Sequence, residues 1–173
     1  MTSQNKGEMY FTPQQLVFTA LMTALVFAAT YLPHIPIPLG YAHLGDAVIF
    51  LLALVAPRRS TLFAACVGSA LADLLGGFAL WIVPTLMIKF VMAEIVCRIG
   101  RTEYGLAGHV RVILALGLSS LWMAAAYTLA GALLYDSFSA ALASSPGLLM
   151  EGLVNSVLAF LLLPLLRERF PKI

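Results

Sequence analysis

The chain has 173 residues, of which 61% are hydrophobic and only 10% are charged. Soluble domains carry about 25% charged residues, so this composition is typical of a membrane protein. The formal charge of +2 does not indicate nucleic-acid binding, and six spans of about 20 residues would leave no room for a soluble catalytic domain.

Apolar runs in chain order predict six membrane-spanning helices. They cover Gln14 to Leu32, Leu44 to Ala56, Thr61 to Leu75, Leu80 to Cys97, Val112 to Tyr135 and Gly147 to Leu166. The second and third runs are short, so four spans with a re-entrant hairpin are the alternative. The prediction is an all-α integral membrane protein in which residues 1–173 form one compact bundle of six transmembrane helices.

The basic residues predict the orientation of this bundle, because cytoplasmic loops are enriched in Lys and Arg. In the six-span arrangement nine basic residues fall on one side: Lys6, Arg58, Arg59, Arg98, Arg101, Arg111, Arg167, Arg169 and Lys172. The loops on the other side contain no Lys or Arg. Both termini are therefore predicted to be cytoplasmic.

Lys89 is the exception, because it lies within the fourth predicted span. At 1.5 Å per residue it is about 12 Å below Trp81, near the middle of the membrane. An ionisable group at that depth usually faces a cavity or a partner. Asp73 or Glu151 would serve as its partner, and Asn155 shares one helix face with Glu151.

Asp46 begins the second apolar run, with His43 just before it. Two interpretations stay open. Asp46 is either a carboxylate at the outer mouth, favoured by the dipole of its helix, or part of the lining at the entrance to a binding site. Glu94 precedes Arg98 by four residues, the spacing of a helical ion pair.

Aromatic side chains complete a predicted outer cluster. Trp81 and Tyr135 fall where interfacial aromatic belts are expected, whereas Trp122 and Tyr127 lie deeper. A flat ring bound between the deeper pair would also satisfy their polar atoms. The candidate substrate-binding residues are Trp81, Lys89, Trp122, Tyr127, Glu151, Asn155, Asp73 and His43. No catalytic residue, metal ligand or cofactor is predicted.

Small residues recur every four positions on two predicted spans. Ala20, Ala24 and Ala28 form one ridge, and Ala64, Gly68 and Ala72 form another. Such ridges let helices approach closely. Each ridge serves either packing within the bundle or contact with another protein.

Three blocks resemble a known family. "HLGDAVIFLLALVAPR" from His43, "GSALADLLGG" from Gly68 and "WIVPTLMIKFVMA" from Trp81 resemble the S components of energy-coupling factor (ECF) vitamin transporters, especially the riboflavin-transporter-like branch. The motif resemblance covers about residues 43 to 93. It implies a six-helix bundle with cytoplasmic termini, and the ridge at Ala20, Ala24 and Ala28 matches the family's docking motif.

The resemblance also implies a mechanism and partners. The subunit would capture a water-soluble vitamin at its extracellular half, in the plasma membrane of a prokaryote. A transmembrane coupling (T) subunit and two cytoplasmic ABC ATPases would then drive uptake. The chain itself lacks the G-x-x-x-x-G-K-[ST] phosphate loop, so it is not expected to be an enzyme.

Two other functions remain possible from the residues alone. A stand-alone proton-coupled transporter would use Lys89 with Asp73 or Glu151 as a relay, although no internal repeat is visible. An intramembrane enzyme is the other possibility, but the sequence lacks the H-E-x-x-H and G-x-S-x-G motifs that such an enzyme would use. Because the predicted outer half holds one Lys and no Arg, the expected substrate is a compact neutral or weakly basic ring. Pyridoxine or hydroxymethylpyrimidine is the first choice and riboflavin the second.

Overall fold

The computed structural model describes residues 12–32, 35–101 and 105–167. Six helices account for most of these residues: α1 (Pro13–Tyr31), α2 (Gly45–Val55), α3 (Arg58–Leu75), α4 (Ile82–Ile95), α5 (Leu106–Leu134) and α6 (Phe138–Arg167). A short antiparallel hairpin, β1 (Ile35–Ile37) and β2 (Gly40–Ala42), joins α1 to α2. A 3₁₀ turn, η1 (Ala79–Trp81), precedes α4, and a π-helical turn, η2 (Val96–Gly100), follows it. The predicted all-α fold is therefore confirmed for these residues, with the hairpin as an addition.

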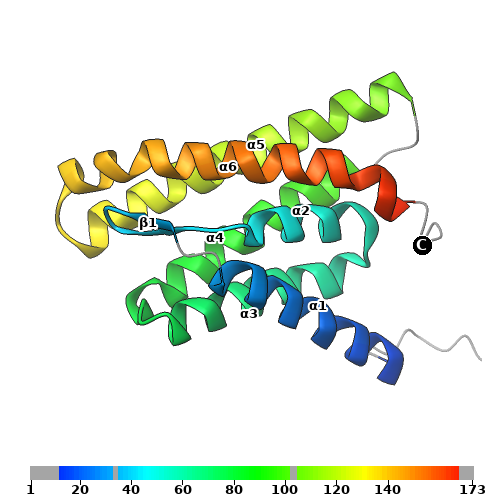
Figure 1. The fold of residues 1–173 in the computed structure, drawn as a ribbon, viewed down its shortest axis with the longest axis horizontal. Coiled ribbons are helices and arrows are strands. Elements are labelled where there is room, and N and C mark those ends of the chain that lie inside the picture. Colours follow the sequence, from blue (N-terminus) through cyan, green and yellow to red (C-terminus); the bar gives the residue numbers. More distant parts are fainter. Residues whose placement is uncertain (1–11, 33–34, 102–104, 168–173) are drawn as a thin grey trace, which may run out of the picture.

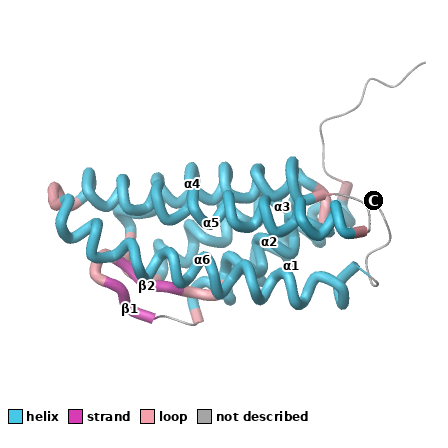
Figure 2. Tube along the Cα trace, turned by 90° about the horizontal axis from the view of Figure 1, so that it is seen from above, coloured by secondary structure: helices cyan, strands magenta, loops and turns pink. Residues whose placement is uncertain are grey.

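The six helices run lengthwise along the bundle in alternating directions (Figure 1). The hairpin and the α5–α6 link lie at one end, whereas α1 begins, α2 passes into α3 and α6 ends at the other. Figure 2 shows the hairpin beside α6. Around the bundle the helix contacts follow the order α1, α3, α4, α5, α6, α2 and back to α1.

Within the described residues, four segments are long and apolar enough to cross a membrane: Pro13–Tyr31, Ala79–Gly100, Leu106–Leu134 and Phe138–Arg167. The helix α2 is apolar but has only 11 residues. The six-span count and the cytoplasmic side of both termini stay predictions. Three of the nine basic residues on which that side rests, Lys6, Arg169 and Lys172, lie outside the described residues.

The helix α2 forms the centre of the core. Nine of its 11 residues are buried, because its sequence is apolar on every face. At the C-terminal end of α2, the Arg101 guanidinium donates to the Ala53 carbonyl at 2.8 Å and also to the Ala56 carbonyl. A cation at this position satisfies carbonyls that the helix leaves open.

The two small-residue ridges have different surroundings. Ala64, Gly68 and Ala72 are buried where α3 packs on α1, and a Cβ added at Gly68 would lie 2.8 Å from the Thr23 carbonyl oxygen. This ridge is internal packing. On α1, by contrast, Ala20 and Ala24 are exposed and Ala28 is half-buried.

Two predicted helix starts differ clearly from the structure: α5 begins at Leu106 rather than Val112, and α6 begins well before Gly147. We expected an outer loop from Asp136 to Pro146, but α6 begins at Phe138 and continues through Pro146. The Ser137 hydroxyl accepts the Ala140 N–H at 3.3 Å near the start of the helix, and the alanines that follow favour helix. The added turns of α6 bring Ala141 and Ser144 alongside the hairpin end of the bundle, where they line a pocket together with Leu148.

Candidate functional site

A pocket opens between the hairpin, the last turn of α3, η1 and helices α4, α5 and α6. It contains about 530 Å³ of space free of protein atoms, counting its opening to solvent. Its walls are Ile37, Leu39, Gly40, Tyr41, His43, Asp73, Phe78, Trp81, Thr85, Lys89, Tyr127, Ala141, Ser144, Leu148 and Glu151. Apolar and aromatic walls with a few convergent polar groups are typical of small-molecule sites.

An aromatic wall forms one side of this pocket. The rings of Trp81 and Tyr127 have centroids 5.6 Å apart, and the Trp81 indole N–H donates to the Tyr135 hydroxyl at 3.2 Å. The Tyr127 hydroxyl donates to the Thr85 hydroxyl at 3.0 Å. These bonds fix the rings, so a planar ligand would meet a preformed surface.

Tyr41 and Asp73 lie on the hairpin side. The Tyr41 hydroxyl donates to an Asp73 carboxylate oxygen at 3.0 Å, and its ring lies 5.0 Å from the ring of Phe78, centroid to centroid. Burial, followed by the negative charge of Asp73, raises the pKa of Tyr41 above its ordinary value. The phenol therefore stays protonated and continues to donate to Asp73.

Lys89 forms an ion pair with Asp46 at the base of the pocket. Their side chains are 1% and 0% exposed, so the pair is buried completely. The Lys89 ammonium also lies 5.3 Å from the centre of the Tyr127 ring, within cation–π range. The expected ion-pair partners, Asp73 and Glu151, are not the ones found. The placement of Asp46 at an exposed outer mouth was also wrong, although Asp46 does occupy the first turn of α2.

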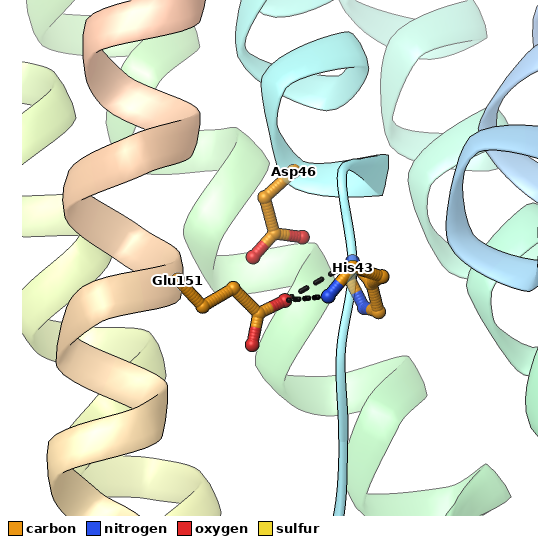
Figure 3. Close-up of side chains that lie close together, drawn as sticks. All are labelled: His43, Asp46 and Glu151. Atoms are coloured by element: carbon orange, nitrogen blue, oxygen red, sulfur yellow. Dashed lines mark hydrogen bonds and ion pairs between the residues drawn. The ribbon is translucent and has the colours of Figure 1, made fainter. Parts of the chain in front are cut away.

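Glu151 contacts His43 in the wall of the pocket. Its carboxylate accepts the His43 backbone N–H at 3.3 Å and lies 3.1 Å from the imidazole Nδ1 (Figure 3). One turn further along α6, Asn155 accepts the Ala47 N–H at 2.9 Å and donates to the His43 carbonyl at 2.8 Å. These contacts attach the segment between β2 and α2 to α6.

The pocket brings together six of the eight residues expected to bind substrate: Trp81, Lys89, Tyr127, Glu151, Asp73 and His43. Asn155 lies behind the wall, fully buried. Trp122 is 38% exposed and donates its indole N–H to the Ile88 carbonyl at 3.2 Å, away from the pocket lining. Sequence reasoning missed Thr85, Phe78 and Ser144, which carry no charge that would have singled them out.

Near the opposite end of α4, Glu94 pairs with Arg98, as its spacing predicted. Arg58 joins this pair, with its Nε 2.7 Å from Glu94. All three groups lie away from the pocket, and the two arginines are well exposed. The cluster connects α3 to α4.

Long apolar helices around a pocket with apolar and aromatic walls and a few polar groups are typical of a membrane protein that binds a small molecule. The family described as ECF-type riboflavin transporter, S component, matches residues 10–168 of this chain. The chain belongs to that family. It is thus a transmembrane, substrate-binding subunit for vitamin uptake rather than an enzyme.

The chain is also similar to a Pyrococcus woesei protein described as "Uncharacterized protein in gap 3'region". The two are 36% identical over 112 residues, which cover 64% of this chain and 73% of that protein.

Proposed function

We propose that this subunit captures a small single-ring vitamin or precursor for ATP-driven uptake, with pyridoxine or hydroxymethylpyrimidine as the first choice. The observation that carries this proposal is the pocket, whose aromatic wall and buried charged groups suit a flat polar ring. Its extracellular location follows from the predicted orientation, with the basic ends of the helices in the cytoplasm of a prokaryote.

Charge supports the choice of ring. The buried polar groups at the pocket include three carboxylates, Asp46, Asp73 and Glu151, against one ammonium, Lys89. A polyanion such as folate would meet repulsion there, whereas a neutral or weakly basic ring with N–H or O–H donors would pair with the carboxylates. Riboflavin is the second choice, supported by the description of the family.

The partners are proposed on the family's pattern. A T subunit would contact the ridge of Ala20, Ala24 and Ala28, and two cytoplasmic ABC ATPases would supply the energy. The exposure of Ala20 and Ala24 supports this assignment, since a ridge used for internal packing would be covered. The buried face of α1 is instead formed by Thr19, Met22, Thr23, Val26 and Thr30.

Fluorescence provides the test. Of the two tryptophans, Trp81 lines the pocket and Trp122 does not, so the Trp122→Phe protein carries its single indole at the site. Titration of this variant with pyridoxine, hydroxymethylpyrimidine, riboflavin and folate should give saturable quenching with a single-ring compound. Mass spectrometry of small molecules released from the denatured wild-type protein identifies a co-purified ligand independently. Tight binding of riboflavin alone would overturn the first choice.

A further inference from the structure

Three buried side chains at the base of the pocket come from separate parts of the chain. His43 precedes α2, Asp46 lies in the first turn of α2, and Glu151 lies on α6. One potential metal-ligand atom from each lies within 4.8 Å of the others. Figure 3 shows the three side chains converging on one space between α2, α6 and the end of the hairpin. We propose that this space binds a divalent transition-metal cation.

The strongest observation is an unused carboxylate oxygen. Asp46 is 0% exposed, and its Oδ1 pairs with Lys89, but its Oδ2 has no hydrogen-bond partner among the described residues. A buried charged oxygen without a partner is costly, so native proteins nearly always satisfy it. Asp46 is not part of the pocket lining, so an organic ligand held in the pocket would not reach Oδ2.

The contact between Glu151 and His43 points the same way. The imidazole Nδ1 accepts the Gly45 N–H at 3.2 Å and also lies 3.1 Å from a Glu151 carboxylate oxygen. Two such atoms are stable at this distance when a proton or a cation lies between them. A metal would take over the lone pair that now accepts from Gly45.

The spacing and charge both fit a divalent ion. Ligands about 2.1 Å from a metal lie roughly 3 to 4.2 Å from one another, so the 4.8 Å span needs only a small contraction. Two carboxylates, Asp46 and Glu151, lie at the site beside one ammonium, Lys89, and a bound divalent cation favours the ionised form of both carboxylates. A nitrogen ligand with two carboxylates favours ions such as Zn²⁺ over Mg²⁺, which prefers oxygen and water.

Such a metal would also influence the substrate. His43 and Glu151 line the pocket, so coordination positions left open by the protein would face a bound molecule. A hydroxyl or ring nitrogen of the ligand would be able to complete the coordination shell. Metal binding itself does not depend on the proposed vitamin, because it is measured with no vitamin present.

The test is a calorimetric titration of the full-length, detergent-purified protein with ZnCl₂ after treatment with EDTA, with MgCl₂ as the comparison ion. We expect one Zn²⁺ per chain and much weaker binding of Mg²⁺. The His43→Gln and Glu151→Gln variants should each lose at least about tenfold in Zn²⁺ affinity. Asp73→Asn is the matched control, because it removes a carboxylate from the same pocket without removing a proposed ligand, and should lose only a few-fold.

Substitution of Co²⁺ provides a second, spectroscopic measurement. Its visible absorption reports nitrogen and oxygen ligands directly, and the band should be absent from any variant that elutes as a folded monodisperse protein but lacks His43. Absence of stoichiometric Zn²⁺ binding by the wild type would overturn the proposal. So would equal losses in Asp73→Asn and Glu151→Gln, which indicate general attraction rather than ligation.

Discussion

The buried ion pair between Lys89 and Asp46 should be the most sensitive electrostatic contact in the bundle. Both side chains are essentially unexposed, so removing one partner leaves the other charge buried without compensation. Such losses cost about 3 to 5 kcal/mol. For a chain of this size that corresponds to a decrease of about 6 to 20 °C in Tm. We expect Asp46→Asn and Lys89→Gln each to show this decrease.

The double variant distinguishes pairing from separate contributions. With both charges removed, neither group is left uncompensated, so Asp46→Asn combined with Lys89→Gln should lose clearly less stability than the sum of the single losses. Thermal unfolding in detergent, followed by fluorescence-detected size exclusion, measures all three variants. Arg98→Gln is the control, because its side chain is 72% exposed and its loss should be below about 1 kcal/mol. A loss of stability in the double variant equal to the sum of the two single losses would refute the reasoning.

Three further results are expected. Asn155→Ala leaves the Ala47 N–H and the His43 carbonyl without their partner, so the free energy of unfolding should fall by about 1 to 3 kcal/mol. An unchanged free energy of unfolding would contradict the supporting role of Asn155. Ala24→Trp should abolish uptake by the assembled transporter, while the isolated subunit still binds its ligand. The buried counterpart, Ala64→Trp, should impair folding itself. Equal loss of uptake and of ligand binding in Ala24→Trp would contradict the assignment of this ridge as a docking surface. A cysteine at exposed Arg59 should react with an impermeant maleimide only after cells are permeabilised, and labelling of intact cells would reverse the predicted topology.

Helix positions followed closely from the sequence because hydrophobic runs are a local property. The predicted second span, Leu44 to Ala56, differs from α2 by one residue at each end. The start of α6 was missed because Ser and Pro around Pro146 resemble loop residues, whereas the packing of this segment beside the hairpin favours helix.

The pairing of Asp46 could not be read from its neighbours in sequence. The arginines that follow α2 predict that this helix runs from the outside to the cytoplasm. That direction suggested a water-exposed position for the N-terminal end of α2, where Asp46 lies. However, 11 residues of helix extend only about 16 Å, roughly half of a 30 Å hydrocarbon layer. The first turn of α2 therefore lies deep in the bundle if its other end is at the surface. The short length was a signal that Asp46 and Lys89 lie at similar depth.

Along one face of α6, one residue supports the neighbouring backbone and others line the pocket. Asn155 holds the backbone that leads into α2, while Leu148, Ser144 and Ala141, about two to four turns away, line the pocket. The side chains of Leu148 and Ala141 have no polar atoms, so their exchange alters the shape of the cavity and leaves the hydrogen bonds of Asn155 intact. A library confined to these two positions would therefore change which ring is accepted while the bundle keeps its fold, which makes α6 the natural helix on which to redesign the specificity of this subunit.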